Sequence, residues 1–198
     1  VDRQGKDRLC SLLQEAVIGF LGETPLDHPD YPRIINEKHF HRLESLLSGG
    51  RILWGGQQKD GRIAPTLMDE IAPGAAVMEE EIFGPILPIL PYDTLEEAMD
   101  FVRSRPKPLA LYLFTRDKQV QRRVLSTLPF GGGCVNDTIV HLTSPHLPFG
   151  GVGNSGMGSY HGKASFDTFS HYKSILIRGG HPDLPLRYHP YSEKKLGW

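Results

Sequence analysis

The chain lacks several features that would place a protein in a broad class at once. Its formal net charge is −1, from 22 basic and 23 acidic residues, so no overall field attracts nucleic acid or an anionic membrane surface. No apolar run approaches the ~20 residues of a membrane-spanning helix, and no signal-peptide pattern is present. Only two cysteines occur, Cys10 and Cys134. We therefore expect a soluble cytoplasmic protein with no nucleic-acid partner and no membrane span.

Common catalytic and metal-binding signatures are missing as well. There is no G-x-S-x-G nucleophile elbow and no P-loop lysine. The histidine pairs His39/His41 and His141/His146 have neither a shared helix face nor nearby cysteines, so no metal site is expected. Cys10 lies on the apolar face of a predicted helix and Cys134 in a predicted strand, where packing is favoured over a nucleophilic role.

What the chain does have is glycine, concentrated in "PFGGVGNSGMG" at residues 148–158. Gly151 to Gly156 match G-x-G-x-x-G literally, the pattern of dinucleotide-binding folds. A true fingerprint follows a strand, opens a helix and has an acidic residue ~20 positions further on. Here the preceding residues 141–148 predict a loop, and Gly156 to Ser159 are a poor helix start. We interpret the glycines as a tight loop with close backbone approaches, so a small Rossmann dehydrogenase is not expected.

Hydrophobic periodicity predicts alternating helices and strands. Helices are expected over 6–21, from Asn36 to Gly49, between Thr94 and Pro106, from Asp117 to Leu128, and over 163–169. Strands are expected over 51–54, 62–68, 86–90, 109–114 and 172–177, and a further short strand is expected to end at Asn136. This order is typical of an α/β fold with an open, mainly parallel sheet and flanking helices.

An acidic cluster, Glu79 to Glu81, is followed by Ile82-Phe83-Gly84-Pro85. One interpretation is a solvated helix end that meets a turn. The other is a ligand site, in which a carboxylate accepts hydrogen bonds from sugar hydroxyls while the Phe83 ring covers a flat ligand. Composition alone leaves both interpretations open.

Four segments together resemble the aldehyde dehydrogenase superfamily. They are "VMEEEIFGPILPIL" (77–90), "KPLALYLFT" (107–115), "GGGCVNDTIVH" (131–141) and "LPFGGVGNSGMGSYHGKASFDTFSHYKS" (147–174). The Gly-Met-Gly-Ser-Tyr-His-Gly-Lys and Ser-Phe-Asp-Thr-Phe-Ser-His runs are similar to the class 3 and fatty aldehyde branch. The resemblance covers residues 5–178 in the right order.

The resemblance implies NAD(P)-dependent oxidation of an aldehyde to a carboxylic acid, through a thiohemiacetal on a cysteine. By its motifs, Glu81 matches the carboxylate that binds the nicotinamide ribose and Phe83 the ring beside it. His39 and Arg42 fall on a helix that approaches the cofactor. The substrate pocket would be lined by Phe149, Leu142 and Thr143.

The same resemblance leaves the catalytic cysteine, the general-base glutamate and the oxyanion asparagine outside this chain, together with the half that holds most of NAD or NADP. We therefore expect residues 1–170 to form a catalytic domain that is incomplete at its N-terminus. Residues 171–178 would be a strand of the oligomerisation region of a homodimer, and 179–198 a tail. The chain alone would be inactive. The alternative is a truncated, non-catalytic interaction module that pairs through residues 172–177.

Overall fold

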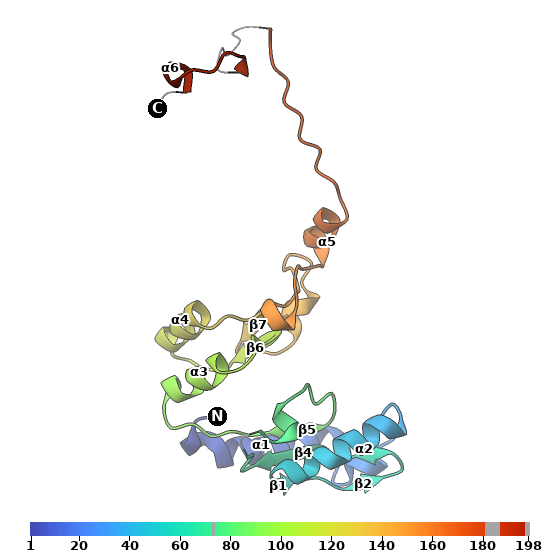
Figure 1. Ribbon diagram of the computed structural model, residues 1–198. Coiled ribbons are helices and arrows are strands. Elements are labelled where there is room, and N and C mark those ends of the chain that lie inside the picture. Colours follow the sequence, from blue (N-terminus) through green and yellow to red (C-terminus); the bar gives the residue numbers. More distant parts are fainter. Residues whose placement is uncertain (73, 181–186, 197–198) are drawn as a thin grey trace. The chain divides into compact units, whose positions relative to one another are not determined.

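The computed structural model describes residues 1–72, 74–180 and 187–196. Within the chain two compact units are distinguished, Val1–Pro106 with Ser126–Leu128, and Lys107–Leu125 with Pro129–Trp198. Figure 1 shows the order of the elements in both. The expected division at residues 170 and 178 stays a prediction.

Two helices of the first unit begin where the local signals predict, and the first also ends there, whereas the second gives way to a 3-10 turn, Leu47–Gly49, before the expected stop. Helix α1 is Lys6–Leu21 and is followed by Gly22, whose φ of +77° suits glycine. Helix α2 is Glu37–Leu46, and the Asn36 side chain accepts a hydrogen bond from the His39 backbone N–H at 2.9 Å. The predicted caps are therefore confirmed.

Helix α3, Leu95–Arg103, shows the predicted capping pattern with one shift. The Glu97 N–H donates to Thr94 Oγ1 at 3.2 Å, while the Glu97 carboxylate accepts from the N–H of Asp93 rather than from that of Thr94. Backbone donors at the helix start are satisfied in both cases.

The first unit contains a three-stranded sheet of order β1-β4-β5. The strands are β1 (Arg51–Trp54), β4 (Thr66–Asp69) and β5 (Ile86–Pro88). Strand β4 runs antiparallel to β1 and parallel to β5. All four residues of β4 are buried, as expected for the central strand.

The single strand expected over 62–68 is broken in two at Pro65, which has no N–H to donate to a ladder. Its first part is β3 (Arg62–Ile63), which forms an antiparallel hairpin with β2 (Gln58–Lys59). The connecting residues Asp60 and Gly61 both have positive φ, +50° and +73°, the geometry of a two-residue hairpin turn. The Asp-Gly pair was a local signal for this hairpin that the sequence interpretation missed.

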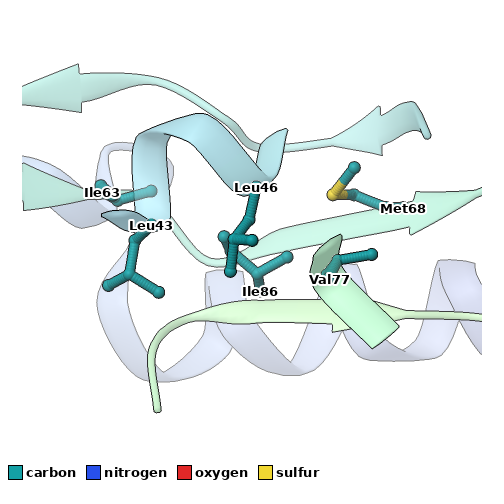
Figure 2. Close-up of a cluster of buried hydrophobic side chains, with 6 residues drawn as sticks. All are labelled: Leu43, Leu46, Ile63, Met68, Val77 and Ile86. Carbon is teal, nitrogen blue, oxygen red and sulfur yellow. The ribbon is translucent and has the colours of Figure 1, made fainter. Parts of the chain in front are cut away.

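One hydrophobic cluster forms the core of the first unit (Figure 2). It joins α2 to the sheet and to the turn before β5, and consists of Leu43, Leu46, Ile63, Met68, Val77 and Ile86. Each of these side chains is buried, so the apolar face of α2 is accounted for by this packing.

A buried carboxylate ties α1 to the sheet. The Asp69 side chain on β4 is 1% exposed and accepts hydrogen bonds from Lys6 Nζ and from two nitrogens of Arg51, both at 2.9 Å. The Arg51 guanidinium and, after it, the Lys6 ammonium lower the pKa of Asp69 to about 2, against the opposing effect of burial.

The second unit contains the parallel pair β6 (Ala110–Leu113) and β7 (Gly132–Val135). Helix α4, Lys118–Thr127, connects them in sequence. The Asp117 side chain accepts from the N–H of Gln119 at 2.7 Å, which confirms the predicted cap.

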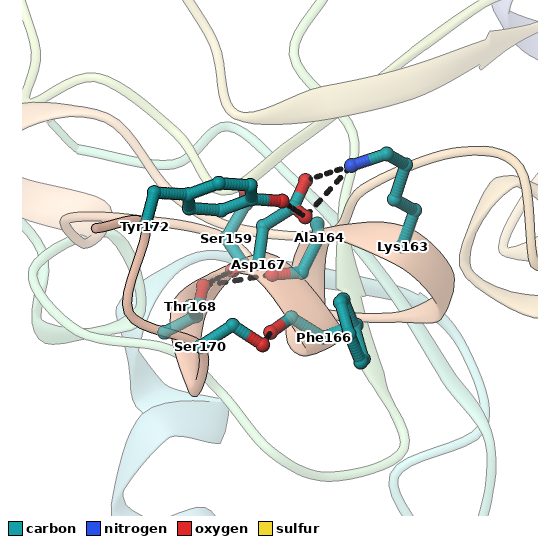
Figure 3. A network of polar contacts seen from close by, with 8 residues as sticks. All are labelled: Ser159, Lys163, Ala164, Phe166, Asp167, Thr168, Ser170 and Tyr172. Carbon is teal, nitrogen blue, oxygen red and sulfur yellow. Dashed lines mark hydrogen bonds and ion pairs between the residues drawn. The ribbon is translucent and has the colours of Figure 1, made fainter. Parts of the chain in front are cut away.

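Helix α5, Gly162–Thr168, carries a polar network (Figure 3). Lys163 Nζ donates to both oxygens of Asp167, at 2.7 and 2.5 Å, and the Tyr172 hydroxyl donates to the same carboxylate at 2.5 Å. These bonds lower the pKa of Asp167 and raise that of Tyr172. Tyr172 thereby attaches the start of residues 171–179 to α5.

Residues 172–177 join no strand ladder with another described segment, so the strand expected there is not formed here and stays a prediction for a partner. In the expected tail, residues 181–186 and 197–198 lie outside the described residues. The described part contains the short helix α6, Glu193–Leu196, and residues 187–194 are exposed.

The glycine-rich stretch is a closed loop. Phe149 and Tyr160 exchange two backbone hydrogen bonds of 2.9 Å, and between them lies only a 3-10 turn, Gly153–Ser155. A Cβ at position 151 would lie 2.1 Å from the Ser155 carbonyl oxygen. Within residues 144–161 no strand precedes the motif and no helix follows it directly. The dinucleotide-binding interpretation therefore has no structural support.

The α/β class is confirmed, with two parallel and two antiparallel strand pairings among the described residues. Further short 3-10 turns lie at Arg3–Gly5, Pro25–Asp27, Leu47–Gly49, Ala76–Met78 and Val140–Thr143. None of the described helices has the length and apolar composition needed to cross a membrane.

Asp69→Asn is expected to lower the free energy of unfolding by about 1 to 2 kcal/mol at pH 7. Because the folded pKa of Asp69 lies below its unfolded value, this stabilisation is complete above about pH 4 and is lost as the pH falls to about 2. Urea unfolding between pH 7 and pH 2 measures it. Asp93→Asn, in the exposed pair with Arg3, is the control and should cost much less. Equal losses in both variants would contradict the assignment.

Gly151→Ala is expected to destabilise the protein by about 2 kcal/mol, because its Cβ meets backbone. Gly153→Ala should cost about 1 kcal/mol, since only its φ of +62° is unfavourable. Gly180→Ala, with open space around it, is the control. Urea unfolding gives the three values. A Gly153→Ala protein that remains folded but has lost NAD binding would restore the dinucleotide-binding interpretation.

Candidate functional site

Helix α2 carries two of the candidate cofactor residues, His39 and Arg42. They lie one turn apart on the same side of the helix. The helix begins at Asn36 and is held in place by the buried side chains of Leu43 and Leu46. His39 is exposed, whereas Arg42 is half-buried. The apolar face of α2 therefore fixes the position of the helix, and its polar side chains lie on the other face.

The Arg42 guanidinium binds the acidic segment on both sides of Glu81. Its Nη1 donates to the Glu80 carboxylate at 2.8 Å, and its Nη2 donates to the Ile82 carbonyl oxygen at 2.5 Å. A guanidinium presents several donors in one plane and suits this double contact. In this structure Arg42 thus fixes the backbone that carries Glu81.

Glu81 and Phe83 both face solvent. The Glu81 side chain has no hydrogen bond or ion pair with any described residue, and the Phe83 side chain is 83% exposed. Phe83 also has a φ of +48°, a conformation that is costly for a bulky residue. Both side chains are therefore accessible to a ligand.

Close packing on Leu43 explains why the turn takes this shape. A Cβ at position 84 would lie 2.5 Å from Leu43 Cδ2, so any larger residue would require the buried leucine or the turn to move. Gly84 packs against Leu43, and the Ile82 carbonyl oxygen accepts a hydrogen bond from Arg42. The side chains of Glu81 and Phe83, in the same turn, are exposed instead.

In the second unit the candidate Phe149 lies in an aromatic cluster. Its ring centroid is 5.8 Å from those of His141 and Tyr160 and 5.7 Å from that of His161, on which it stacks with an interplanar angle of 20°. His161 has a φ of +80°, a strained backbone conformation like that of Phe83. Phe149 itself is half-buried, so part of its ring remains accessible.

Leu142 and Thr143 belong to the 3-10 turn Val140–Thr143. Leu142 is half-buried, Thr143 is exposed, and the Thr143 hydroxyl donates to the Val140 carbonyl oxygen at 2.8 Å. Their neighbour His141 contacts the Phe149 ring. The structure therefore connects these two residues to Phe149 through His141.

His141 and Cys134 form a contact that the sequence interpretation missed. Cys134 Sγ lies 3.6 Å from His141 Nδ1. Both cysteines of the chain are free. Cys10 is only half-buried, and α1 contains no buried residue. Cys10 is therefore not part of the described core, contrary to expectation. Among the described residues, no three His, Cys, Asp or Glu side chains gather closely enough to hold a metal ion.

The candidate residues thus form two groups, each described within its own unit. In the first unit Arg42 is brought to the segment that carries Glu81, and Phe83 follows in the same turn. The His39 side chain forms no hydrogen bond or ion pair with this segment of the described chain. In the second unit His141 contacts the Phe149 ring and precedes Leu142 and Thr143 in the same 3-10 turn.

Comparison with known proteins supports one family throughout. The sequence model described as "Aldehyde dehydrogenase family" matches residues 1–175. The chain is 49% identical over 193 residues to 4,4'-diaponeurosporen-aldehyde dehydrogenase of Staphylococcus aureus, which covers 96% of this chain and 42% of that protein. It is 46% identical over 201 residues to aldehyde dehydrogenase family 3 member A2 of Rattus norvegicus, covering 100% of this chain and 42% of the relative.

Solved structures agree. A substrate-bound state of AldH from Staphylococcus aureus has a TM-score of 0.89 and 48% identity, over 98% of this chain and 43% of that one. An aldehyde dehydrogenase of Mycobacterium tuberculosis complexed with NAD+ has a TM-score of 0.74 and 27% identity, over 92% and 40%. The chain spans about two-fifths of the length of these relatives. These matches confirm the resemblance seen in the sequence: the chain belongs to the aldehyde dehydrogenase family.

Proposed function

We propose that this chain is the C-terminal part of an NAD(P)-dependent aldehyde dehydrogenase that oxidises aldehydes to carboxylic acids. The observation that carries the proposal is the continuous match of residues 1–175 to the family, at 46 to 49% identity to relatives named as aldehyde dehydrogenases. The nucleophilic cysteine that forms the thiohemiacetal would lie outside this chain. Within the chain, the contribution would be to bind the cofactor and to line the substrate pocket.

Glu81 and Phe83 fit the nicotinamide ribose. An ionised carboxylate accepts hydrogen bonds only, and two neighbouring ribose hydroxyls are suitable donors. Glu81 is exposed and has no partner among the described residues, and the exposed Phe83 ring offers a flat apolar surface beside it. Bound NAD or NADP would supply the hydride acceptor. Arg42 would act by holding the segment around Glu81, and His39 would approach the cofactor from α2.

Phe149, Leu142 and Thr143 would line the substrate pocket. The half-buried Phe149 ring and the Leu142 side chain would present apolar atoms to an aldehyde's hydrocarbon part and exclude water. Thr143, exposed at the end of its 3-10 turn, would lie at the entrance.

The complete protein would be a homodimer located in the cytoplasm. Residues 172–177 support the dimer, because their backbone is unpaired in the described chain while Ile175, Leu176 and Ile177 are between 67% and 91% exposed. A second chain could add a strand here. The two free cysteines are in keeping with a reducing compartment.

The coding sequence upstream of Val1 and the intact mass of the natural protein test the proposal. A cysteine-containing catalytic segment and a cofactor-binding half upstream, together with aldehyde-dependent NADH or NADPH formation by the complete protein, are the expected results. A start codon directly before Val1 and an intact mass near 22.1 kDa would instead favour the truncated interaction module.

Glu81→Gln in the complete protein is expected to raise the KM for the nicotinamide cofactor about tenfold or more, because a hydrogen bond to a charged group is replaced by a weaker one. Steady-state kinetics with varied cofactor measures this. Glu79→Gln is the matched control, an exposed glutamate of the same cluster, and should leave the KM unchanged. Unchanged cofactor KM in Glu81→Gln would exclude the ribose contact.

Leu176→Pro is expected to shift the complete protein from dimer to monomer, because proline removes a backbone donor from the proposed strand. Leu176→Ala keeps the donor and should remain mostly dimeric. Sedimentation velocity distinguishes the two species. If Leu176→Pro sediments as the unaltered dimer, residues 172–177 do not pair across the dimer.

A further inference from the structure

His141 is the most buried polar side chain of the second unit that the proposed chemistry does not use. It is 8% exposed, and its Nε2 is buried without a hydrogen-bond partner among the described residues. A buried nitrogen without a partner costs free energy, which an apolar side chain at this position would avoid.

The imidazole is fixed to the β6–β7 pair by three contacts. Its Nδ1 lies 3.6 Å from Cys134 Sγ on β7, and its ring meets the Tyr112 ring on β6 edge to face, with centroids 5.8 Å apart. A Cβ at Gly132 would lie 3.1 Å from His141 Cδ2, so the ring also packs against the β7 backbone. Because these contacts come from adjacent strands in register, the ring has little freedom to move.

The His141 ring also contacts the Phe149 ring. The two centroids are 5.8 Å apart and the planes are inclined by 49°. The other rings that contact Phe149, those of Tyr160 and His161, belong to the same glycine-rich loop end as Phe149 itself. Of the ring contacts found for Phe149 among the described residues, that with His141 is the one that reaches the strands.

We infer that His141 is a positioning residue for Phe149. Its ring, held by contacts with β6 and β7, keeps the Phe149 ring in the orientation that would line the aldehyde pocket. The inference rests on the proposed function, because it assumes that Phe149 contacts substrate. His141 touches neither substrate nor cofactor in this account. Removing its ring takes away the ring contact that Phe149 makes on the strand side, so the Phe149 ring takes up several orientations and binds the aldehyde less well.

A double-mutant cycle in the complete protein tests the inference with His141→Ala, Phe149→Ala and the double variant. The His141→Ala protein is expected to have an aldehyde KM raised about three- to tenfold, with kcat and cofactor KM within about twofold of the unmodified protein. In the Phe149→Ala background the same change should have no further effect, because there is no ring left to position. His146→Ala, an exposed histidine five positions along the chain, is the matched control and should change nothing.

His141→Leu is the second variant, because it fills most of the space and keeps the protein folded if the alanine variant does not. It should raise the aldehyde KM in the same direction, since it lacks the ring and the Nδ1 contact. Effects of His141 and Phe149 that simply multiply, or a His141 variant with unchanged aldehyde KM, would overturn the inference while leaving the pocket role of Phe149 intact. An unchanged aldehyde KM in Phe149→Ala alone would instead overturn the proposed pocket, and the inference with it.

Discussion

The close approach of Leu43 on α2 to Gly84 is the constraint on which the candidate cofactor site depends. Leu43 is fully buried in the core of the first unit, so its position is determined by packing rather than by the turn. Gly84 allows the turn to approach this leucine closely, and the preceding residue, Phe83, has a positive φ. Arg42 completes the arrangement by binding Glu80 and Ile82. A buried leucine thus determines which way an acidic segment faces.

The second unit supports its candidate residue by the same principle. Phe149 lies at one end of a glycine-rich loop, where the glycines permit backbone contacts that any Cβ would prevent. The loop meets the strands through the rings of His141 and Tyr112 and through a close backbone approach of Gly150 to Gly131, which precedes β7. In both units, strain or an unsatisfied polar group occurs beside a candidate residue, at Phe83, His161 and His141. Functional sites commonly carry such costs while the surrounding structure holds them in place.

The sequence predicted the elements whose signals are local and failed where tertiary contacts decide. Helix α1 and the caps at Asn36, Thr94 and Asp117 were predicted because capping depends on residues within one turn. The break at Pro65 and the Asp-Gly hairpin also had local signals, which hydrophobic periodicity concealed. The contacts of Arg42 with Ile82 and of His141 with Tyr112 join residues far apart in the chain, so no pattern in either segment could reveal them. The family resemblance supplied the candidate residues themselves, but not what holds them.

The most direct test of the account is a crystal structure of the complete protein with NAD+ bound. The account predicts that the Glu81 carboxylate lies within hydrogen-bond distance of the nicotinamide ribose hydroxyls, with the Phe83 ring against the same part of the cofactor and Arg42 still bound to Glu80 and Ile82. A nicotinamide ribose held by other residues, with Glu81 and Phe83 facing solvent, would contradict it.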